Sequence, residues 1–366
     1  YVTSGVVATG KAQLLLDEYG FQDVYTDGNL DPQALSEVDN VYPSNWVHWT
    51  NAVGQFIIQE ALLMIGGHKI DTLTSEFLFI FEELFGQEGK MLTDMIGKRE
   101  YRDQLIVDSL AARTLFVPLV FSFTGAGVAA LNGSASNFSG SPLPVISLLF
   151  SGAQLTVQFA ALADCVVRSS TDVSVYNIST NAALAAGDLN VTLDIQYVFL
   201  DYEERLKYSL GNFTQVIRQH HYFDHQYSNT ESIRALLNFN HPVLWMAWVI
   251  RRQCQEDAGN WFNFSGIDGR DPIQAATLTL NAQARFSERP PEFFRQAQPW
   301  MHFRRIPKYH IYVYSFAAHP TAADPSGSLN FSRVNTAELI ITAQQGLGDD
   351  GGSYTLYVMA ENFNLV

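Results

Sequence analysis

Residues 299–333 read PWMHFRRIPKYHIYVYSFAAHPTAADPSGSLNFSR, and this stretch decides the fold class. Its centre, residues 311–316, alternates β-branched and aromatic side chains with a period near two, which predicts a half-buried strand. Pro320 and the turn sequence DPSG at 324–327 end that strand, and a second apolar piece follows at 329–334. A strand, a long turn and another strand predict a corner of an antiparallel sheet, not a catalytic site.

The composition is that of a large globular protein rich in strands. The 366 residues are 47% hydrophobic and only 16% charged, which excludes an intrinsically disordered chain. The 25 Phe and 16 Tyr favour strands over helices. A net charge of −15 argues against direct binding of nucleic acid, because that binding requires clustered Lys and Arg.

Two cysteines, Cys165 and Cys254, are too few for a disulfide framework. One bridge is possible, but two buried thiols are the expected state of a protein made in the cytosol. The chain begins at Tyr1 without a signal-peptide pattern, which suggests a missing or processed N-terminus. The most apolar run, residues 115–130, contains Pro118 and is short for a membrane span, so we expect a strand followed by a loop.

Local patterns predict several further elements. Gly66-Gly67 separates two apolar runs and predicts a two-residue hairpin turn. Residues 76–85 place their large apolar side chains on one helical face, so we expect Glu82 and Glu83 to lie on a solvated face and not to form a catalytic pair. Residues 193–208 begin as an alternating strand and continue as an exposed, acidic helix start.

Two motifs match the residues of a functional site, but the sequence around each of them does not support such a site. Residues 346–351 match G-x-G-x-x-G, but a strand pattern follows instead of a helix, so we expect a hairpin loop and no dinucleotide site. His241 precedes Pro242, which predicts a turn histidine before a buried strand, not a catalytic histidine.

The histidines of HHYFDH at 220–225 are the one candidate metal site. His221 and His225 are four residues apart, a spacing that holds zinc when the segment is a helix. The sequence offers neither the glutamate of a zinc-protease motif nor an evident third ligand. We therefore predict no catalytic residue, no cofactor and no bound metal.

Seven N-x-Ser/Thr triplets are present, and they start at Asn132, Asn137, Asn177, Asn190, Asn212, Asn263 and Asn330. Asn132 and Asn137 lie in a loop of small residues and are the best candidates for N-glycosylation. Asn330 lies in a strand-like segment, where we expect a structural role.

Four motifs together give the chain a family resemblance. GGHKID at 66–71, YVFLDYEER at 197–205, FNHPV at 239–243 and YVYSF with PSGSLNFSR at 312–333 occur in matching order. This sequence resembles the major capsid proteins of nucleocytoplasmic large DNA viruses from about residue 19 to residue 363. The periodicity of the chain agrees with the resemblance as far as an all-β class.

The resemblance implies an all-β fold of two tandem eight-stranded antiparallel jelly rolls, with a few short helices in connecting loops. Residues 1–208 would form the first jelly roll and residues 209–366 the second. The implied function is structural: a major capsid protein that forms trimeric, pseudo-hexameric capsomers in the icosahedral shell of a large double-stranded DNA virus. The implied location is the virion capsid, assembled in the host cytoplasm.

The implied partners are two further copies in a homotrimer, neighbouring capsomers, minor capsid proteins and an inner membrane, without direct contact to nucleic acid. The nearest alternative is a minor capsid or penton protein of the same fold. A β-sandwich carbohydrate-binding protein or enzyme is a more distant alternative. A lectin should show clustered Asp and Asn or a groove lined by tryptophan.

Overall fold

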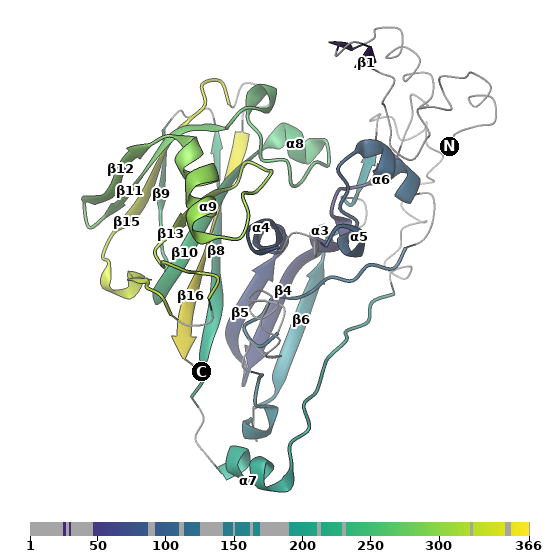
Figure 1. Ribbon diagram of the computed structural model, residues 1–366, viewed down its shortest axis with the longest axis vertical. Coiled ribbons are helices and arrows are strands. Elements are labelled where there is room, and N and C mark those ends of the chain that lie inside the picture. Colours follow the sequence, from purple (N-terminus) through teal and green to yellow (C-terminus); the bar gives the residue numbers. More distant parts are fainter. Residues whose placement is uncertain are drawn as a thin grey trace, which may run out of the picture. The chain divides into compact units, whose positions relative to one another are not determined.

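A computed structural model describes residues 25–26, 29–30, 47–86, 92–109, 113–124, 142–148, 151–161, 164–168, 190–210, 214–228, 232–322, 325–347 and 353–365 (Figure 1). The chain forms two compact units. The smaller unit comprises Tyr1–Thr50, Arg99–Thr114 and Leu162–Val191. The larger unit comprises Asn51–Lys98, Leu115–Ala161 and Thr192–Val366.

The described part of the smaller unit contains short antiparallel strand pairs and a short helix. Strand β1 (Tyr25–Thr26) pairs with β2 (Asn29–Leu30), and β3 (Val47–Trp49) pairs with β7 (Val166–Arg168). Helix α6 (Arg102–Asp108) ends at Ser109, whose Oγ accepts a hydrogen bond of 2.9 Å from the backbone N–H of Trp49. This bond fixes the helix end to the edge of β3.

Two antiparallel sheets form the C-terminal part of the larger unit. The strands are β8 (Val216–Ser228), β9 (Ser232–Leu236), β10 (Pro242–Arg252), β11 (Ile273–Leu280), β12 (Gln283–Arg289), β13 (Tyr312–Ser315), β14 (Leu329–Asn330), β15 (Ala337–Ala343) and β16 (Ser353–Leu365). One sheet has the order β13-β10-β16-β8 with β14 also on β10, and the other has the order β12-β11-β15-β9. The chain repeatedly crosses from one sheet to the other, which is the connectivity of a jelly roll.

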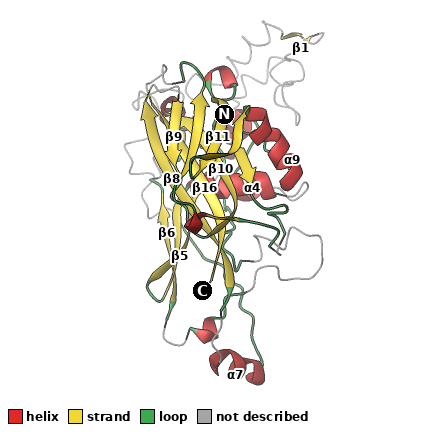
Figure 2. Ribbon diagram, turned by 90° about the vertical axis from the view of Figure 1, so that its left-hand side faces the viewer, coloured by secondary structure: helices red, strands yellow, loops and turns green. Residues whose placement is uncertain are grey.

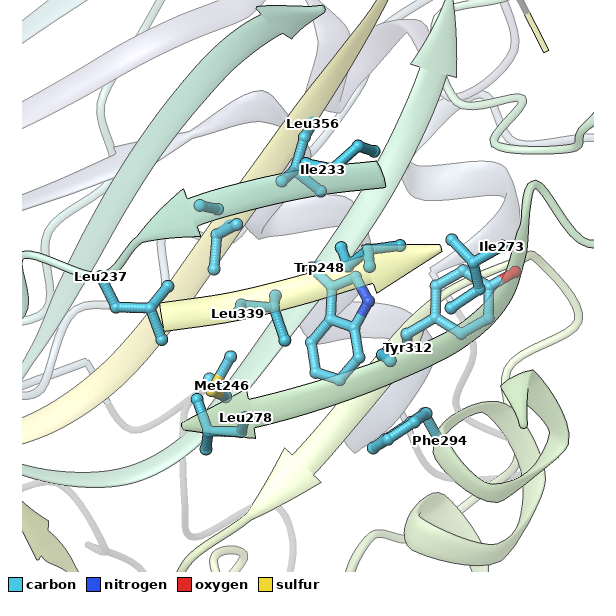
Figure 3. Packing of buried hydrophobic residues seen from close by; sticks show 14 of the residues in the cluster. Ile233, Leu237, Met246, Trp248, Ile273, Leu278, Phe294, Tyr312, Leu339 and Leu356 are labelled. Atoms are coloured by element: carbon cyan, nitrogen blue, oxygen red, sulfur yellow. The ribbon is translucent and has the colours of Figure 1, made fainter. Parts of the chain in front are cut away.

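The core of this part lies between the two sheets. Inward-facing side chains alternate along β15, whose buried positions include Leu339 and Ile341. Trp248 of β10, Tyr312 of β13 and Phe294 pack together in the middle, with ring centroids 5.0 Å apart for Trp248 and Phe294 (Figure 3). Short helical segments lie in the connections between these strands: α8 (Gln253–Asp257), η6 (Ile267–Gly269), η7 (Phe293–Ala297), α9 (Gln298–His302) and η8 (Phe331–Arg333).

The N-terminal part of the larger unit, within residues 51–161, contains a three-stranded antiparallel sheet. Its order is β5 (His68–Thr74), β4 (Ile58–Ile65) and β6 (Ala153–Phe159). The turn between β4 and β5 is confirmed as the predicted Gly66-Gly67 turn, with φ of 59° and 80°. Short helical segments accompany the sheet: α3 (Val53–Phe56), α5 (Thr93–Ile96) and η2 (Val145–Ser147).

Helix α4 (Ser75–Phe85) directly follows β5, and its first turn is capped because Thr74 Oγ1 accepts a hydrogen bond of 3.3 Å from the Phe77 N–H. In Figure 1 this helix is seen end-on between the sheet of β4–β6 and the strands β8 and β10. Figure 2 shows α4 and α9 beside the strands β10 and β16. The helix predicted at 76–85 is therefore confirmed, but it is buried on nearly every side.

Several local predictions need correction. Residues 115–124, the described part of the apolar run, and residues 193–200, the alternating segment, carry no strand where one was expected. The side chains of residues 190–199 are exposed, so this alternation does not bury one face against a neighbouring strand. The acidic helix predicted after it is confirmed as α7 (Tyr202–Leu210), which has no buried residue.

The loop after β15 is not a hairpin loop, because β15 and β16 belong to different sheets. The second apolar piece of the opening stretch is strand β14 for two residues only and then turns into η8. His241 lies in a turn as expected, with φ of 65°. No helix of the described residues is long and apolar enough to cross a membrane.

Candidate functional site

A buried polar seam joins the two parts of the larger unit. We use the word seam for five residues: Asp71 on β5, Arg218 and His220 on β8, Trp245 on β10 and Glu361 on β16. The side chains of Asp71, His220 and Glu361 are each only 2–3% exposed. Asp71 comes from the N-terminal part and the other four residues from the C-terminal part.

The carboxylate of Asp71 contacts the backbone N–H and the ring Nδ1 of His220. Asp71 Oδ1 accepts the backbone N–H of His220 at 2.9 Å, and Asp71 Oδ2 lies 2.9 Å from His220 Nδ1. The side chain of Asp71 on β5 thus accepts a hydrogen bond from the backbone of β8. The side chain of Gln219 also donates to the backbone carbonyl of Ile70.

Glu361 lies on the opposite side of His220, with Oε1 3.8 Å from His220 Nε2. This distance is longer than a hydrogen bond but short enough for charge attraction. Glu361 Oε2 accepts a hydrogen bond of 2.6 Å from Trp245 Nε1 and lies 3.3 Å from Arg218 Nη1. The seam therefore contains two carboxylates, one guanidinium and one imidazole.

Electrostatics favours the charged forms of the seam residues. Burial alone lowers the pKa of His220, but the charges of Asp71 and Glu361 and the hydrogen bond to Asp71 outweigh it and raise that pKa to about 9. Burial alone would raise the pKa of Glu361, but Arg218, His220 and Trp245 hold that pKa below its usual value. A protonated His220 makes the seam electrically neutral.

Glu82 and Glu83 of α4 are buried, so the prediction of a solvated face is wrong. Lys98 Nζ lies 2.8 Å from Glu82 Oε2 and also bonds Glu83 Oε1. Arg305 reaches the same two carboxylates at 3.1 Å each from the C-terminal part. Both glutamates face partners that no local sequence pattern reveals.

Helix α4 carries a third polar link at its first turn. Glu76 Oε1 lies 3.1 Å from Arg251 Nη1 at the end of β10, and Arg251 Nε lies 2.8 Å from Glu256 Oε1. The Arg251 guanidinium also lies over the rings of Trp261 and Tyr357, at 5.3 and 4.5 Å. Together with the seam, these contacts connect β5 to β8 and α4 to β10.

Aromatic packing fills the space between these polar links. Phe77 stacks on Trp245 with ring centroids 6.2 Å apart, and Phe85 lies 5.5 Å from the same indole. Phe79 stacks on Phe262 at 4.2 Å. The phenylalanines of α4 therefore contact the C-terminal part from more than one face of the helix.

A cavity of about 410 Å³ lies beside the seam. Apolar side chains such as Leu63, Ile65 and Phe121 dominate its lining. Asp71 and Arg218 border it, but both are already engaged in the ion pairs of the seam. The cavity thus offers an apolar surface without the convergent polar groups of a typical ligand site.

The zinc interpretation of HHYFDH fails on geometry, because these residues lie on strand β8 and not on a helix. His220 points into the seam, His221 lies near His241 with ring centroids 6.5 Å apart, and His225 contacts Tyr227. In the described part of the chain no three His, Cys, Asp or Glu residues gather as a metal site would require.

The glycosylation candidates Asn132 and Asn137 lie outside the described residues, so their modification stays a prediction. Asn190, of the same triplet type, is described and exposed. Asn330 has a structural contact, since its Oδ1 accepts a hydrogen bond of 3.0 Å from the Ser332 N–H. Cys165 is buried, Cys254 is half-buried, and neither forms a disulfide.

Comparison with known proteins gives two adjoining matches along the chain. Residues 30–201 match the family described as the major capsid protein N-terminus, and residues 204–366 match the large eukaryotic DNA virus major capsid protein. The major capsid protein of Pyramimonas orientalis virus is 26% identical over 348 residues, which cover 87% of this chain and 75% of that protein.

The major capsid protein of Paramecium bursaria Chlorella virus 1 is 25% identical over 78% of this chain and 67% of its own length. A solved structure of that virus's capsid matches with a TM-score of 0.61 at 21% identity, covering 88% of this chain and 85% of the capsid chain. This structural similarity confirms the predicted double jelly-roll fold.

Proposed function

This chain belongs to the major capsid proteins of large eukaryotic DNA viruses, and from this membership we propose that it forms homotrimeric, pseudo-hexameric capsomers of an icosahedral shell. The observation that carries the proposal is the tandem match of two capsid families over residues 30–366, with the jelly-roll connectivity of strands β8–β16. Two similar jelly rolls in one chain present six around a three-fold axis, and such a ring can tile a flat lattice.

The division into jelly rolls at residues 1–208 and 209–366 is part of this proposal. The adjoining family matches meet between residues 201 and 204, and helix α7 with the start of β8 follows. The seam then lies between the two jelly rolls of one chain. Its buried ion pairs would set the angle between them inside each capsomer.

The proposed role is structural throughout, without enzymatic activity. Glu82 and Glu83 of α4 are buried and paired with Lys98 and Arg305, so a substrate cannot reach them as acid–base catalysis requires. We propose neighbouring capsomers, minor capsid proteins and an inner membrane as partners, and assembly in the host cytoplasm. The net charge of −15 supports a layer of other molecules between shell and genome.

The composition of purified virus particles tests this function against its nearest alternative. A major shell protein should be the most abundant band of the particle, while a penton or minor capsid protein should occur at only a small fraction of that amount. Recovery of the chain as a trace component would favour the minor role. Its absence from particles would contradict a capsid role altogether.

A further inference from the structure

His220 is a protonatable group placed where the two parts of the larger unit are joined. Its imidazole is 3% exposed, with Asp71 of β5 on one side and Glu361 of β16 on the other. Arg218 lies two residues away on β8 and is the other cation that reaches Glu361. Among the five seam residues, His220 has the side chain that gains or loses a proton nearest to neutral pH.

The charge count of the seam depends on one proton. With His220 protonated, the charges of Arg218 and His220 balance those of Asp71 and Glu361. Loss of the proton leaves two buried carboxylates and a single guanidinium, which pairs with Glu361. An uncompensated buried charge is among the most destabilising defects in a protein interior.

The other groups that face His220 from the surrounding elements add no charge to the seam at neutral pH. Phe77 of α4 covers the imidazole at 4.0 Å between ring centroids and excludes water. Trp245 of β10 is neutral and donates to Glu361. His221 is the next residue on β8, and burial together with His241 lowers the pKa of His221, so it adds no competing positive charge at neutral pH.

We propose that the seam is a proton-operated lock between the two parts of the larger unit, held closed by protonated His220 and released when His220 loses its proton. Release would free Asp71 of β5 from the edge of β8. Neither sheet loses a backbone ladder in that step, because Asp71 contacts β8 through its side chain. The lock therefore changes how the two parts are joined without unfolding either.

The sign of the effect follows from the raised pKa of His220. An ordinary histidine of the unfolded chain titrates near 6.5, whereas the folded group titrates at about 9. The stabilisation is fully present below the unfolded value and is lost as pH rises through the folded value. Between these two values the contribution of His220 to the folded-to-unfolded ratio should fall about tenfold for each pH unit.

The test compares unfolding of the full chain from pH 6 to 10 in three forms: wild type, His220→Gln and the control His225→Gln, an exposed histidine on the same strand. Wild type and the control should both lose stability steeply from about pH 6.5 to about pH 9, and His220→Gln should lack this loss. The diagnostic is the slope against pH, so a general destabilisation by the substitution does not mimic it. An unchanged slope in His220→Gln would overturn the proposal.

A direct titration provides the second readout. The NMR signals of the His220 ring, assigned by their loss in His220→Gln, should titrate near pH 9, and Asp71→Asn should move that titration to lower pH. Titration of His220 near its ordinary value would contradict the lock. Both experiments use the purified chain in any oligomeric state, so their outcome does not depend on the proposed capsid assembly.

Discussion

Lys98 offers the sharpest test of how α4 is held in the fold. Its side chain is 8% exposed and contacts both Glu82 and Glu83, which are 4% and 3% exposed. Lys98→Met keeps the aliphatic length but leaves two buried carboxylates with Arg305 as their only charged partner among the described residues. Removing one partner of a buried ion pair costs about 3–5 kcal/mol. We expect a value near the lower end, because Arg305 still contacts both carboxylates.

The assay is chemical denaturation of Lys98→Met beside Lys207→Met, which removes a charge from the exposed helix α7. The control should change the free energy of unfolding by less than about 0.5 kcal/mol. Adding Glu83→Gln to Lys98→Met should recover part of the loss, because one unbalanced charge disappears. A Lys98→Met protein as stable as wild type would refute the inferred burial of this cluster.

Three further predictions concern the core, the hairpin and the surface. Trp248 is fully buried, so Trp248→Ala should lower the free energy of unfolding by about 3–5 kcal/mol, measured by thermal or urea unfolding, and Trp248→Phe should lower it less. Equal losses of stability in the two variants would contradict the packing shown in Figure 3. Gly67 has φ of 80° and open space where a Cβ would lie, so Gly67→Ala should cost about 1–2 kcal/mol of unfolding free energy from backbone strain alone. Gly152→Ala is the control, because Gly152 is equally uncrowded but has no positive φ. Equal stability of the two variants would argue against the turn. Intact-mass measurement should find sugar removed by Asn132→Gln or Asn137→Gln, and a mass equal to the bare chain would exclude glycosylation.

Short-range patterns predicted the elements whose partners are close in sequence. The Gly66-Gly67 turn, helix α4, helix α7 and strand β13 all follow from residues within one or two turns of each other. GGHKID, YVYSF and the end of YVFLDYEER lie at these elements, whereas FNHPV leads into β10. The sequence alone therefore sufficed for the fold class, with the jelly-roll connectivity supplied by the resemblance.

The polar contacts around α4 could not be predicted from local patterns. Arg305 contacts Glu82 across 223 residues of sequence, and His220 contacts Asp71 across 149. An amphipathic helix with two adjacent glutamates normally has a solvated face. Here tertiary packing on both sides overrides that pattern, and the only advance signal was the unusual run of four phenylalanines in one short helix.

The strand pattern of residues 193–200 failed for a related reason. Alternation predicts a strand only when a neighbouring strand is available to pair with it and to cover its apolar face. In the described structure Leu193, Ile195 and Tyr197 are each more than half exposed. Sequence periodicity reports the capacity to pair, and long-range topology decides whether pairing occurs.

Light scattering of the purified chain at micromolar concentration tests whether the chain forms a homotrimer. We expect a mass of three chains, stable on dilution, and three-fold capsomers in electron micrographs of particles. The mass of one chain is 40.9 kDa, so a trimer is clearly separated from a monomer or a dimer. A stable monomer or dimer in solution, together with particles that lack three-fold capsomers, would contradict the account.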